Sequence, residues 1–307
     1  MSKNMAASVH QRLLNIAKQR NRRFNDLVQH YALERWLFRL SRSAYGERFV
    51  LKGALLLVAW NTPTTRPTRD IDLLGRISND LGLVRSVIAE IIQTPIEDDG
   101  LVFDPTSVTT ERIAEDADYA GVRAKFLGHL GNARVAMQVD IGFSDVVTPT
   151  PSRITYPTIL DQPAAEILAY NQETAIAEKF EAIVKLGEVN SRMKDFFDIW
   201  LLASSFEFNG LGLAAAIRAT FARRETTLEA EPVGLSNEFA HDPSKAAQWE
   251  AFIRRSLLTD APGEFSEAVV RVRDFLQPVA IAIGEKRAFT AHWPPGGPWQ
   301  SSTLETR

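Results

Sequence analysis

Asp70 and Asp72, separated by Ile71, form the most chemically informative pair in the sequence. Alternate side chains of a β-strand point to the same face, so the two carboxylates share a face while Ile71 points into the core. Two such carboxylates repel each other unless a hard divalent cation lies between them. The small-residue turn Lys52-Gly53-Ala54 precedes them and lets the backbone approach a phosphate. This combination predicts a nucleoside triphosphate bound through Mg²⁺; the alternative is two solvated acids at a strand end.

Asp140 supplies a third carboxylate, in a segment that alternates apolar and polar residues. An aspartate fits poorly in the middle of a strand, so its position needs an explanation. If its strand neighbours that of Asp70 and Asp72 in a mixed sheet, three acids share one face. Carboxylates that bridge two cations can clamp phosphates, activate a hydroxyl and stabilise a leaving oxygen. The alternative for Asp140 is a polar residue at a sheet edge.

Hydrophobic periodicity predicts the elements that position these residues. We expect helices over 8–20, 24–42, 55–60 and 79–93, and strands over 49–51, 70–74, 107–113, 121–130 and 134–143. Pro149, Pro151 and Pro157 mark a connector, and from about Ala164 the chain reads as mainly helical. The pattern is that of an α/β fold.

Composition excludes several classes of protein. The 307 residues include no cysteine, so there is no disulfide framework, thiolate zinc site or cysteine nucleophile. No apolar run reaches the roughly 18 residues of a membrane span. The first residues lack the apolar stretch of a secretory signal, and we expect a cytoplasmic protein.

Charge is unevenly distributed. Residues 1–52 contain eleven Lys and Arg against three acids, although the whole chain has a net charge of −3. This asymmetry favours a basic face that binds a polyanion, and the alternative is a solvated pair of basic helices. The residues assigned to this face are Arg12, Lys18, Arg20, Arg22, Arg23, Arg35, Arg39 and Arg42.

A second set of charged residues lies in the helical part. Lys179 borders an apolar stripe and can extend its ammonium group into a cleft, where it would bind triphosphate oxygens. The alternative is a surface lysine. Asp195 and Asp198 are three residues apart and share a helix face. Asp198 would pair with Lys179 or Arg192 or contact a nucleotide, and Asp195 could equally be a helix cap.

Four motifs in order carry a resemblance to a known family: residues 52–54, 66–73, 139–143, and the helical pair 177–182 and 190–198. With these motifs the chain resembles the DNA polymerase β-type nucleotidyltransferase superfamily. Within it, the chain is most similar to the AbiEii-type nucleotidyltransferase toxins of toxin–antitoxin and phage-defence systems. One position departs from the pattern: Ala54 stands where a serine or glycine is usual, which removes a hydroxyl contact to phosphate.

The resemblance implies a polymerase β-like nucleotidyltransferase core, a small mixed sheet with helices, plus a helical C-terminal part. We expect basic N-terminal helices (1–46), the core (47–160) and a helical domain (161–307) with a frayed tail from residue 290 onward. The implied catalytic residues are Asp70, Asp72, Asp140 and Lys179, of which the three aspartates would bind metal. The implied nucleotide-binding residues are Lys52, Gly53, Ala54, Arg69, Lys179, Lys194, Asp195 and Asp198.

The implied activity is Mg²⁺- or Mn²⁺-dependent transfer of a nucleoside monophosphate from an NTP to RNA, with release of pyrophosphate. The implied acceptor is a tRNA 3′ end, and the implied partner is a cognate antitoxin. Two alternatives stay open. One is a nucleotidyltransferase that modifies a small molecule or a protein, and the other is a non-catalytic nucleotide-binding module.

Overall fold

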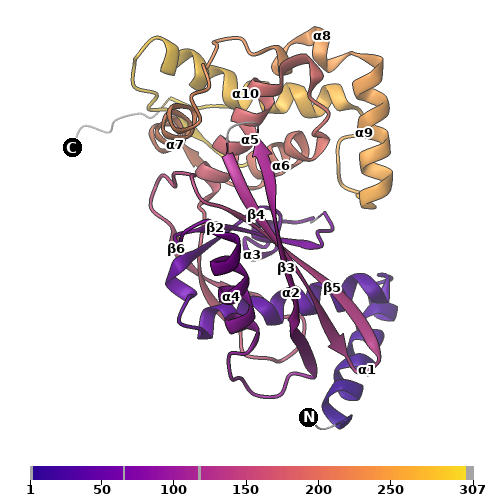
Figure 1. The fold of residues 1–307 in the computed structure, drawn as a ribbon. Helices are drawn as coiled ribbons and strands as arrows, with labels where there is room; N and C mark the ends of the chain where they lie inside the picture. The colour runs from indigo at the N-terminus through magenta and orange to yellow at the C-terminus, as the bar shows by residue number, and fades with distance from the viewer. Residues whose placement is uncertain (1–2, 65, 117–118, 302–307) are drawn as a thin grey trace, which may run out of the picture. The chain divides into compact units, whose positions relative to one another are not determined.

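The computed structural model describes residues 3–64, 66–116 and 119–301 (Figure 1). The chain divides into two compact units. The first comprises Met1–Asn61, Pro67–Asp145 and Ser152–Ala169; the second comprises Thr62–Arg66, Val146–Pro151 and Tyr170–Arg307. The predicted fold class, α/β with a mixed sheet and a helical C-terminal part, is confirmed.

The first unit is built on a seven-stranded mixed sheet in the order β3-β4-β5-β2-β1-β7-β6. Its strands are β1 (Phe49–Lys52), β2 (Asp70–Gly75), β3 (Leu101–Asp116), β4 (Tyr119–Leu130), β5 (Ala133–Gly142), β6 (Ser152–Tyr156) and β7 (Ala165–Ala169). Strand β2 is parallel to β5 and antiparallel to β1. The strands of the three predicted acids are therefore neighbours.

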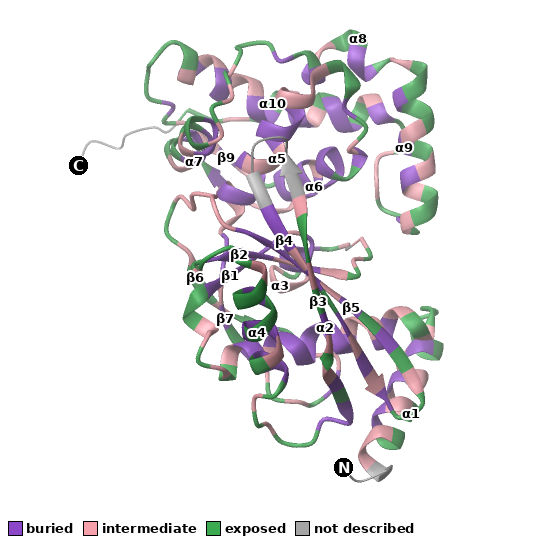
Figure 2. Ribbon diagram, viewed as in Figure 1, coloured by how far each residue is buried: buried purple, intermediate pink, exposed green. Residues whose placement is uncertain are grey.

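The helices of this unit are α1 (Lys3–Gln19), α2 (Phe24–Arg42), α3 (Leu55–Ala59) and α4 (Leu81–Ile92), with a 3₁₀ turn, η1 (Gly46–Arg48). Helices α2 and α4 cover one face of the sheet. Helices α2 and α4 pack side by side, and Trp36 of α2 meets Phe126 of β4 with ring centroids 6.3 Å apart. Strand β1 is buried throughout, whereas α4 exposes its outer side (Figure 2). Because successive side chains of a strand point to opposite faces, the polar side chains lie on the face that α2 and α4 do not cover.

Two arginines assigned to the basic N-terminal face are instead buried in this unit. Arg35 donates from Nε to Asp99 at 3.1 Å, and Arg39 forms a bidentate pair with Asp99 at 2.7 and 3.0 Å. All three side chains are at most 7% exposed. Their charges are neutralised internally, so Arg35 and Arg39 do not form part of an external basic face. Lys18, Arg20, Arg22, Arg23 and Arg42 remain exposed.

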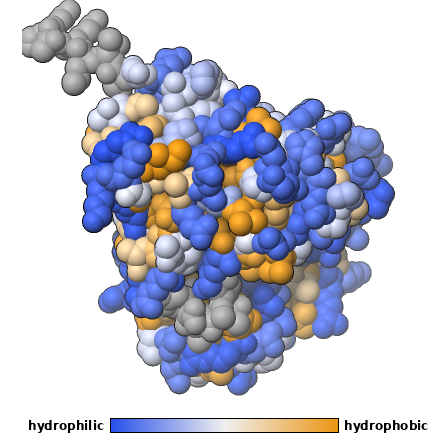
Figure 3. Space-filling model, turned by 90° about the horizontal axis from the view of Figure 1, so that it is seen from above, coloured by the Kyte–Doolittle hydropathy of each residue, from blue (hydrophilic) through white to orange (hydrophobic). Residues whose placement is uncertain are grey.

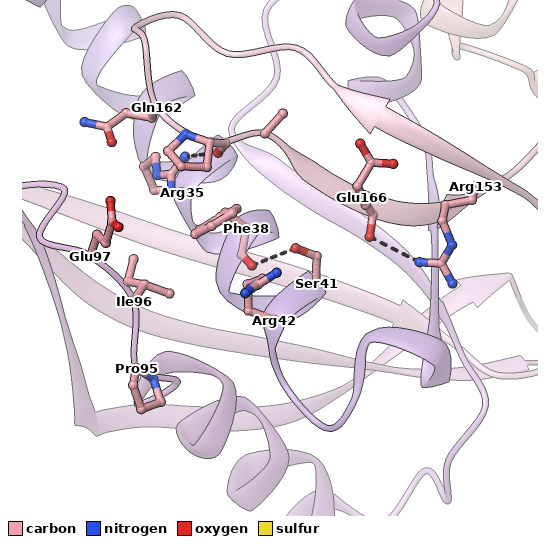
Figure 4. A pocket seen from close by; sticks show the side chains of 12 residues that line it. Arg35, Phe38, Ser41, Arg42, Pro95, Ile96, Glu97, Arg153, Gln162 and Glu166 are labelled. Atoms are coloured by element: carbon pink, nitrogen blue, oxygen red, sulfur yellow. Dashed lines mark hydrogen bonds between the residues drawn. The ribbon is translucent and has the colours of Figure 1, made fainter.

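A hollow of about 700 Å³ lies between α2, the segment before β3, and strands β6 and β7 (Figure 4). Arg35 donates to the carbonyl oxygen of Pro163 at 2.8 Å, and Arg153 donates to that of Glu166 at 3.4 Å. Arg153 also pairs with Glu47. These two cations already have protein acceptors.

Glu34 fixes α2 against the segment between β6 and β7. Its Oε2 accepts the backbone N–H of Ile159 at 2.7 Å, and the residue is 1% exposed. Burial raises the pKa of Glu34 to about 7, although Ile159 and Arg35 act in the opposite direction. Among the described residues, Glu34 Oε1 and the nearby Tyr156 hydroxyl have no hydrogen-bond partner.

Glu34 should make the stability of the protein depend on pH. Because its pKa is raised on folding, its stabilising contribution is present below the ordinary value of 4.5 and is lost as the pH rises through about 7. The loss amounts to about 3 kcal/mol. We expect Glu34→Gln to reduce the change of the urea midpoint between pH 5 and 8. The control, Glu166→Gln, should keep the pH dependence of the parent. A parent-like pH slope in Glu34→Gln would contradict the assignment.

The second unit is mainly helical. Its elements are α5 (Gln172–Leu186), η2 (Gly187–Val189), α6 (Met193–Ser205), β8 (Phe208–Asn209), α7 (Gly210–Arg223), η3 (Val233–Leu235), α8 (Asn237–Ala240), α9 (Pro243–Ser256), α10 (Phe265–Gly284) and β9 (His292–Trp293). Aromatic contacts join α6, α8 and α10: the Phe196 ring lies 5.1 Å from Phe265 and 5.7 Å from Phe239. Asn171 caps α5 through its side chain.

The structure corrects two expectations about the later chain. The prediction that the chain is mainly helical from Ala164 is wrong at β7, which pairs with β1 and β6 inside the sheet. Residues 290–301 do not fray: Trp293 is fully buried and donates to Ala203 at 2.7 Å, and Trp299 stacks on Phe275. The remainder of the expected tail, residues 302–307, lies outside the described residues.

Apolar side chains on the face seen in Figure 3 form separate patches among hydrophilic ones. No helix in the described part of the chain combines the length and apolarity that crossing a membrane requires.

Candidate active site

Strand register places the predicted acids in a row of charged residues across five strands. Asp72 of β2 lies directly opposite both Lys52 of β1 and Asp140 of β5. Asp140 in turn lies opposite Arg123 of β4, which lies opposite Glu111 of β3. Laterally paired residues point to the same face. The row Lys52, Asp72, Asp140, Arg123 and Glu111 therefore lies on the sheet face opposite α2 and α4.

A second row runs beside the first, two residues away along β2, β5 and β4. It consists of Asp70, Gln138, Lys125 and Thr109. The structure thus brings Asp70, Asp72 and Asp140 onto one face, as the sequence predicted. Asp72 and Asp140 are direct neighbours on strands about 4.8 Å apart.

Asp140 is engaged by an arginine that the sequence analysis did not single out. Arg123 donates from Nε and Nη2 to the two carboxylate oxygens at 2.8 and 2.7 Å, and Gln138 donates to Oδ2 at 3.2 Å. The hydrogen bonds to Asp140 raise the pKa of Arg123, and the charges of Asp70 and Glu111 act in the same direction. Arg123 is therefore the counter-ion of the acidic row.

The three aspartates fit a hard divalent cation by their chemistry and by their shared face. In the arrangement described here, however, no group of three or more acidic, histidine or cysteine side chains among the described residues is placed to hold one ion. The bidentate bond to Arg123 explains this for Asp140, whose oxygens point along the sheet to β4. Asp140 would have to leave Arg123 to share an ion with Asp72.

Gly53 is required by its contact with Asp72. Its φ of +76° is in the left-handed region, and a Cβ added there would lie 2.0 Å from Asp72 Oδ2. The absence of a side chain thus lets the turn after β1 pass directly over the carboxylate. Ala54, buried at the start of α3, makes no side-chain cap. The neighbouring Lys52 is 6% exposed and bonds to Asp145 at 2.8 Å.

Gly53→Ala should therefore displace Asp72 and destabilise the first unit. We expect a loss of at least about 1 kcal/mol in the free energy of unfolding, because both the backbone strain and the clash oppose alanine. The control is Gly212→Ala in α7, where the added Cβ meets nothing within 4 Å. Urea denaturation of both variants gives the comparison. Equal midpoints would show that the turn relaxes without cost.

The second unit contains a network of charged side chains around Lys179 of α5. Lys179 Nζ contacts Asp198 at 2.7 Å and Asp195 at 3.3 Å. Arg66 donates to both oxygens of Asp198 at 2.9 and 3.0 Å, and Arg192 pairs with Asp195 at 2.5 Å. Three cations thus surround the two carboxylates. The expected pairing of Lys179 with Asp198 is present, and Arg192 pairs with Asp195 instead of Asp198.

Burial and charge act against each other in this network. Burial alone would raise the pKa of Asp198, but Arg66 and Lys179 outweigh it and lower the value to about 2. Burial likewise lowers the pKa of Lys179, yet Asp198 and Asp195 shift it upward overall. Both side chains are therefore charged at neutral pH. Lys194, also predicted to bind the nucleotide, is exposed on α6.

Removing the charge of Asp198 should destabilise the second unit strongly. Asp198→Asn leaves Arg66 and Lys179 without their shared partner, and breaking such a buried pair costs about 3–5 kcal/mol. The parent's contribution from Asp198 is present above the ordinary pKa of 3.8 and is lost as the pH falls through about 2. Chemical denaturation measures both effects, with the exposed Glu250→Gln as control. Equal losses in the two variants would contradict this account.

Sequence reasoning missed three partners of the predicted residues: Arg123, Asp145 and Arg66. Arg123 and Lys125 alternate with apolar residues on β4, and this period of two indicates that they share a face of the sheet. Nothing in that pattern indicates that Arg123 lies opposite Asp140. Arg66 belongs to the motif at 66–73, but its carboxylate partner is 132 residues away.

A mixed sheet with neighbouring aspartates, and a glycine turn pressed against one of them, is the arrangement that the sequence analysis expects of a nucleotidyltransferase. The sequence matches the nucleotidyl transferase AbiEii toxin of type IV toxin–antitoxin systems over residues 35–275, and the chain belongs to this family. It is thus a nucleotidyltransferase toxin. No curated protein matches it significantly.

Two solved structures are similar in fold. MenT4, a nucleotidyltransferase toxin from Mycobacterium tuberculosis H37Rv, has 14% identity and a TM-score of 0.50, covering 92% of this chain and 99% of MenT4. JHP933 from Helicobacter pylori has 14% identity and a TM-score of 0.45, covering 82% of this chain and 89% of JHP933. The likeness to MenT4 supports the assignment of the fold.

Proposed function

We propose that the protein transfers a nucleoside monophosphate from an NTP to the 3′ end of an RNA, with tRNA as the substrate class. The adjacency of Asp72 and Asp140 in the β2–β5 register is the observation that supports this most directly. Two carboxylates on one polar face, beside a glycine turn whose backbone passes directly over one of them, suit phosphoryl transfer.

In this proposal Asp70, Asp72 and Asp140 would hold Mg²⁺ or Mn²⁺, and the metal would polarise the phosphates and lower the pKa of the acceptor hydroxyl. The hydroxyl oxygen attacks the α-phosphorus, the bond to the bridging oxygen breaks, and pyrophosphate leaves. Asp140 would release Arg123 and accept the proton of the attacking hydroxyl. Lys52 and the backbone at Gly53 and Ala54 position the triphosphate.

Lys179 and its network supply positive charge for the leaving pyrophosphate. Lys179 carries a full charge and contacts two carboxylates. A phosphate oxygen can take the place of one carboxylate while the other still binds the ammonium group. Lys194, exposed on α6, adds a further cation, while Asp195 and Asp198 orient Lys179. Arg69, expected among the nucleotide-binding residues, lines a hollow of the first unit together with Asp70.

The biological setting follows from the family. A type IV toxin acts with a cognate antitoxin, and we propose that both act in the cytoplasm, where NTPs and tRNA are present. A role in phage defence is part of the same proposal. Exposed Arg20, Arg22 and Arg23 would contribute to RNA binding through phosphate contacts.

The test is incubation of the purified protein with each labelled NTP, Mg²⁺ or Mn²⁺ and total tRNA. We expect label in tRNA with one or a few NTPs. Asp72→Asn and Asp140→Asn should lower transfer at least about a hundredfold because each removes a group that stabilises the transition state. Lys179→Ala should raise the KM for NTP more than Lys179→Arg does, and Arg85→Ala on the exposed side of α4 should behave as the parent.

Folded Asp72→Asn with parent activity would overturn the mechanism. Label in protein or in a small molecule, with none in RNA, would establish the alternative acceptor. Absence of transfer to every acceptor, with NTP still bound, would establish a non-catalytic nucleotide-binding module.

A further inference from the structure

A second hollow of the first unit, of about 500 Å³, lies on the polar face of the sheet beside the acidic row. Gln138, Lys125 and Thr109 line it together with Asp70, so the second row of the sheet runs through it. Gln138 precedes Asp140 by two residues, which is about 7 Å along a strand. A molecule bound here would be next to the predicted reaction centre.

The charge of this hollow favours an anion. Arg69, Lys125 and Arg134 line it against a single carboxylate, Asp70. Arg69 and Arg134 are exposed, and among the described residues neither guanidinium group has an acidic partner. Lys125 pairs with Glu111, but both side chains are about half exposed and such a pair is weak. In the larger hollow of Figure 4, by contrast, Arg35 and Arg153 are occupied by protein acceptors.

The position of Arg69 is fixed by its backbone. Gln29 of α2 donates from Nε2 to the carbonyl oxygen of Arg69 at 3.3 Å and to that of Ala136 at 3.1 Å. This bond ties the start of β2 to β5 at the edge of the hollow. Arg23, at the exposed turn between α1 and α2, precedes Gln29 by six residues, or about 9 Å of helix.

We propose that this hollow is the acceptor subsite and binds phosphates of the RNA strand immediately before its reacting 3′ hydroxyl. The inference rests on the proposed function and assigns its acceptor to particular residues. Arg69 and Arg134 bind the phosphates, and Lys125 supplies a further cation. A polycationic acceptor is repelled by the same three cations.

The experiment measures binding of a fluorescent single-stranded RNA of about 12 nucleotides across a salt series, without NTP. For Arg69→Glu/Arg134→Glu we expect the log–log salt slope to fall by about 1.4, since each lost phosphate contact on a single strand removes about 0.7. Arg69→Lys/Arg134→Lys should keep the slope, and Arg85→Glu, on the exposed side of α4, is the matched reversal control. NTP affinity, measured separately, should match the parent in all variants.

The outcomes separate the subsite from the proposed function. Parent-like RNA affinity and salt slope in the Glu variant, while the parent protein labels RNA, would overturn the subsite alone. A loss of NTP affinity without loss of RNA affinity would return Arg69 to the triphosphate site and likewise overturn the proposal. Failure of the parent protein to bind or label any RNA, with NTP bound normally, would overturn the proposed acceptor and the subsite together.

Discussion

The lateral register of β1, β2, β5 and β4 is the constraint on which the rest of this protein depends. Because side chains alternate with a period of two, a shift of one residue in any of these pairings would turn Asp72 or Asp140 toward α2 and α4. The register holds because Val139 and Ile71, buried on the helix-covered face, would be exposed by the same shift. Core packing on one face thus fixes the chemistry of the other.

Neighbouring carboxylates repel each other, and the structure shows how the fold tolerates them. Lys52 and Arg123 flank Asp72 and Asp140 in the same row, so like charges are enclosed by opposite ones. The network of Lys179, Asp195 and Asp198 follows the same rule on a helix pair. Buried ion pairs of this kind add little net stability, because desolvation offsets the Coulomb attraction. Their value lies in charged groups that are held in position and can exchange a protein partner for phosphate.

The cations of the chain fall into two groups with different consequences. Arg35, Arg39 and Arg66 are bound by protein carboxylates, which hold them in position inside the fold. Arg69 and Arg134 are exposed beside the acidic row and are available to a ligand. Counting charges along the sequence does not separate these groups, since burial depends on which carboxylate each side chain meets.

The sequence by itself determined the local features. The Asp70–Asp72 period, the glycine turn at Gly53, the common face of Asp195 and Asp198 and most elements up to β5 follow from short-range periodicity and backbone sterics, and the structure contains them. The metal and nucleotide roles of these residues stay predictions. Tertiary structure decided the pairing of Asp140 with Arg123, of Lys52 with Asp145 and of Asp198 with Arg66. It also placed β7 in the sheet and buried Arg35 and Arg39 on Asp99. Each of these depends on groups far apart in the chain, whose meeting is set by strand order and core packing and leaves no periodic signal in the sequence.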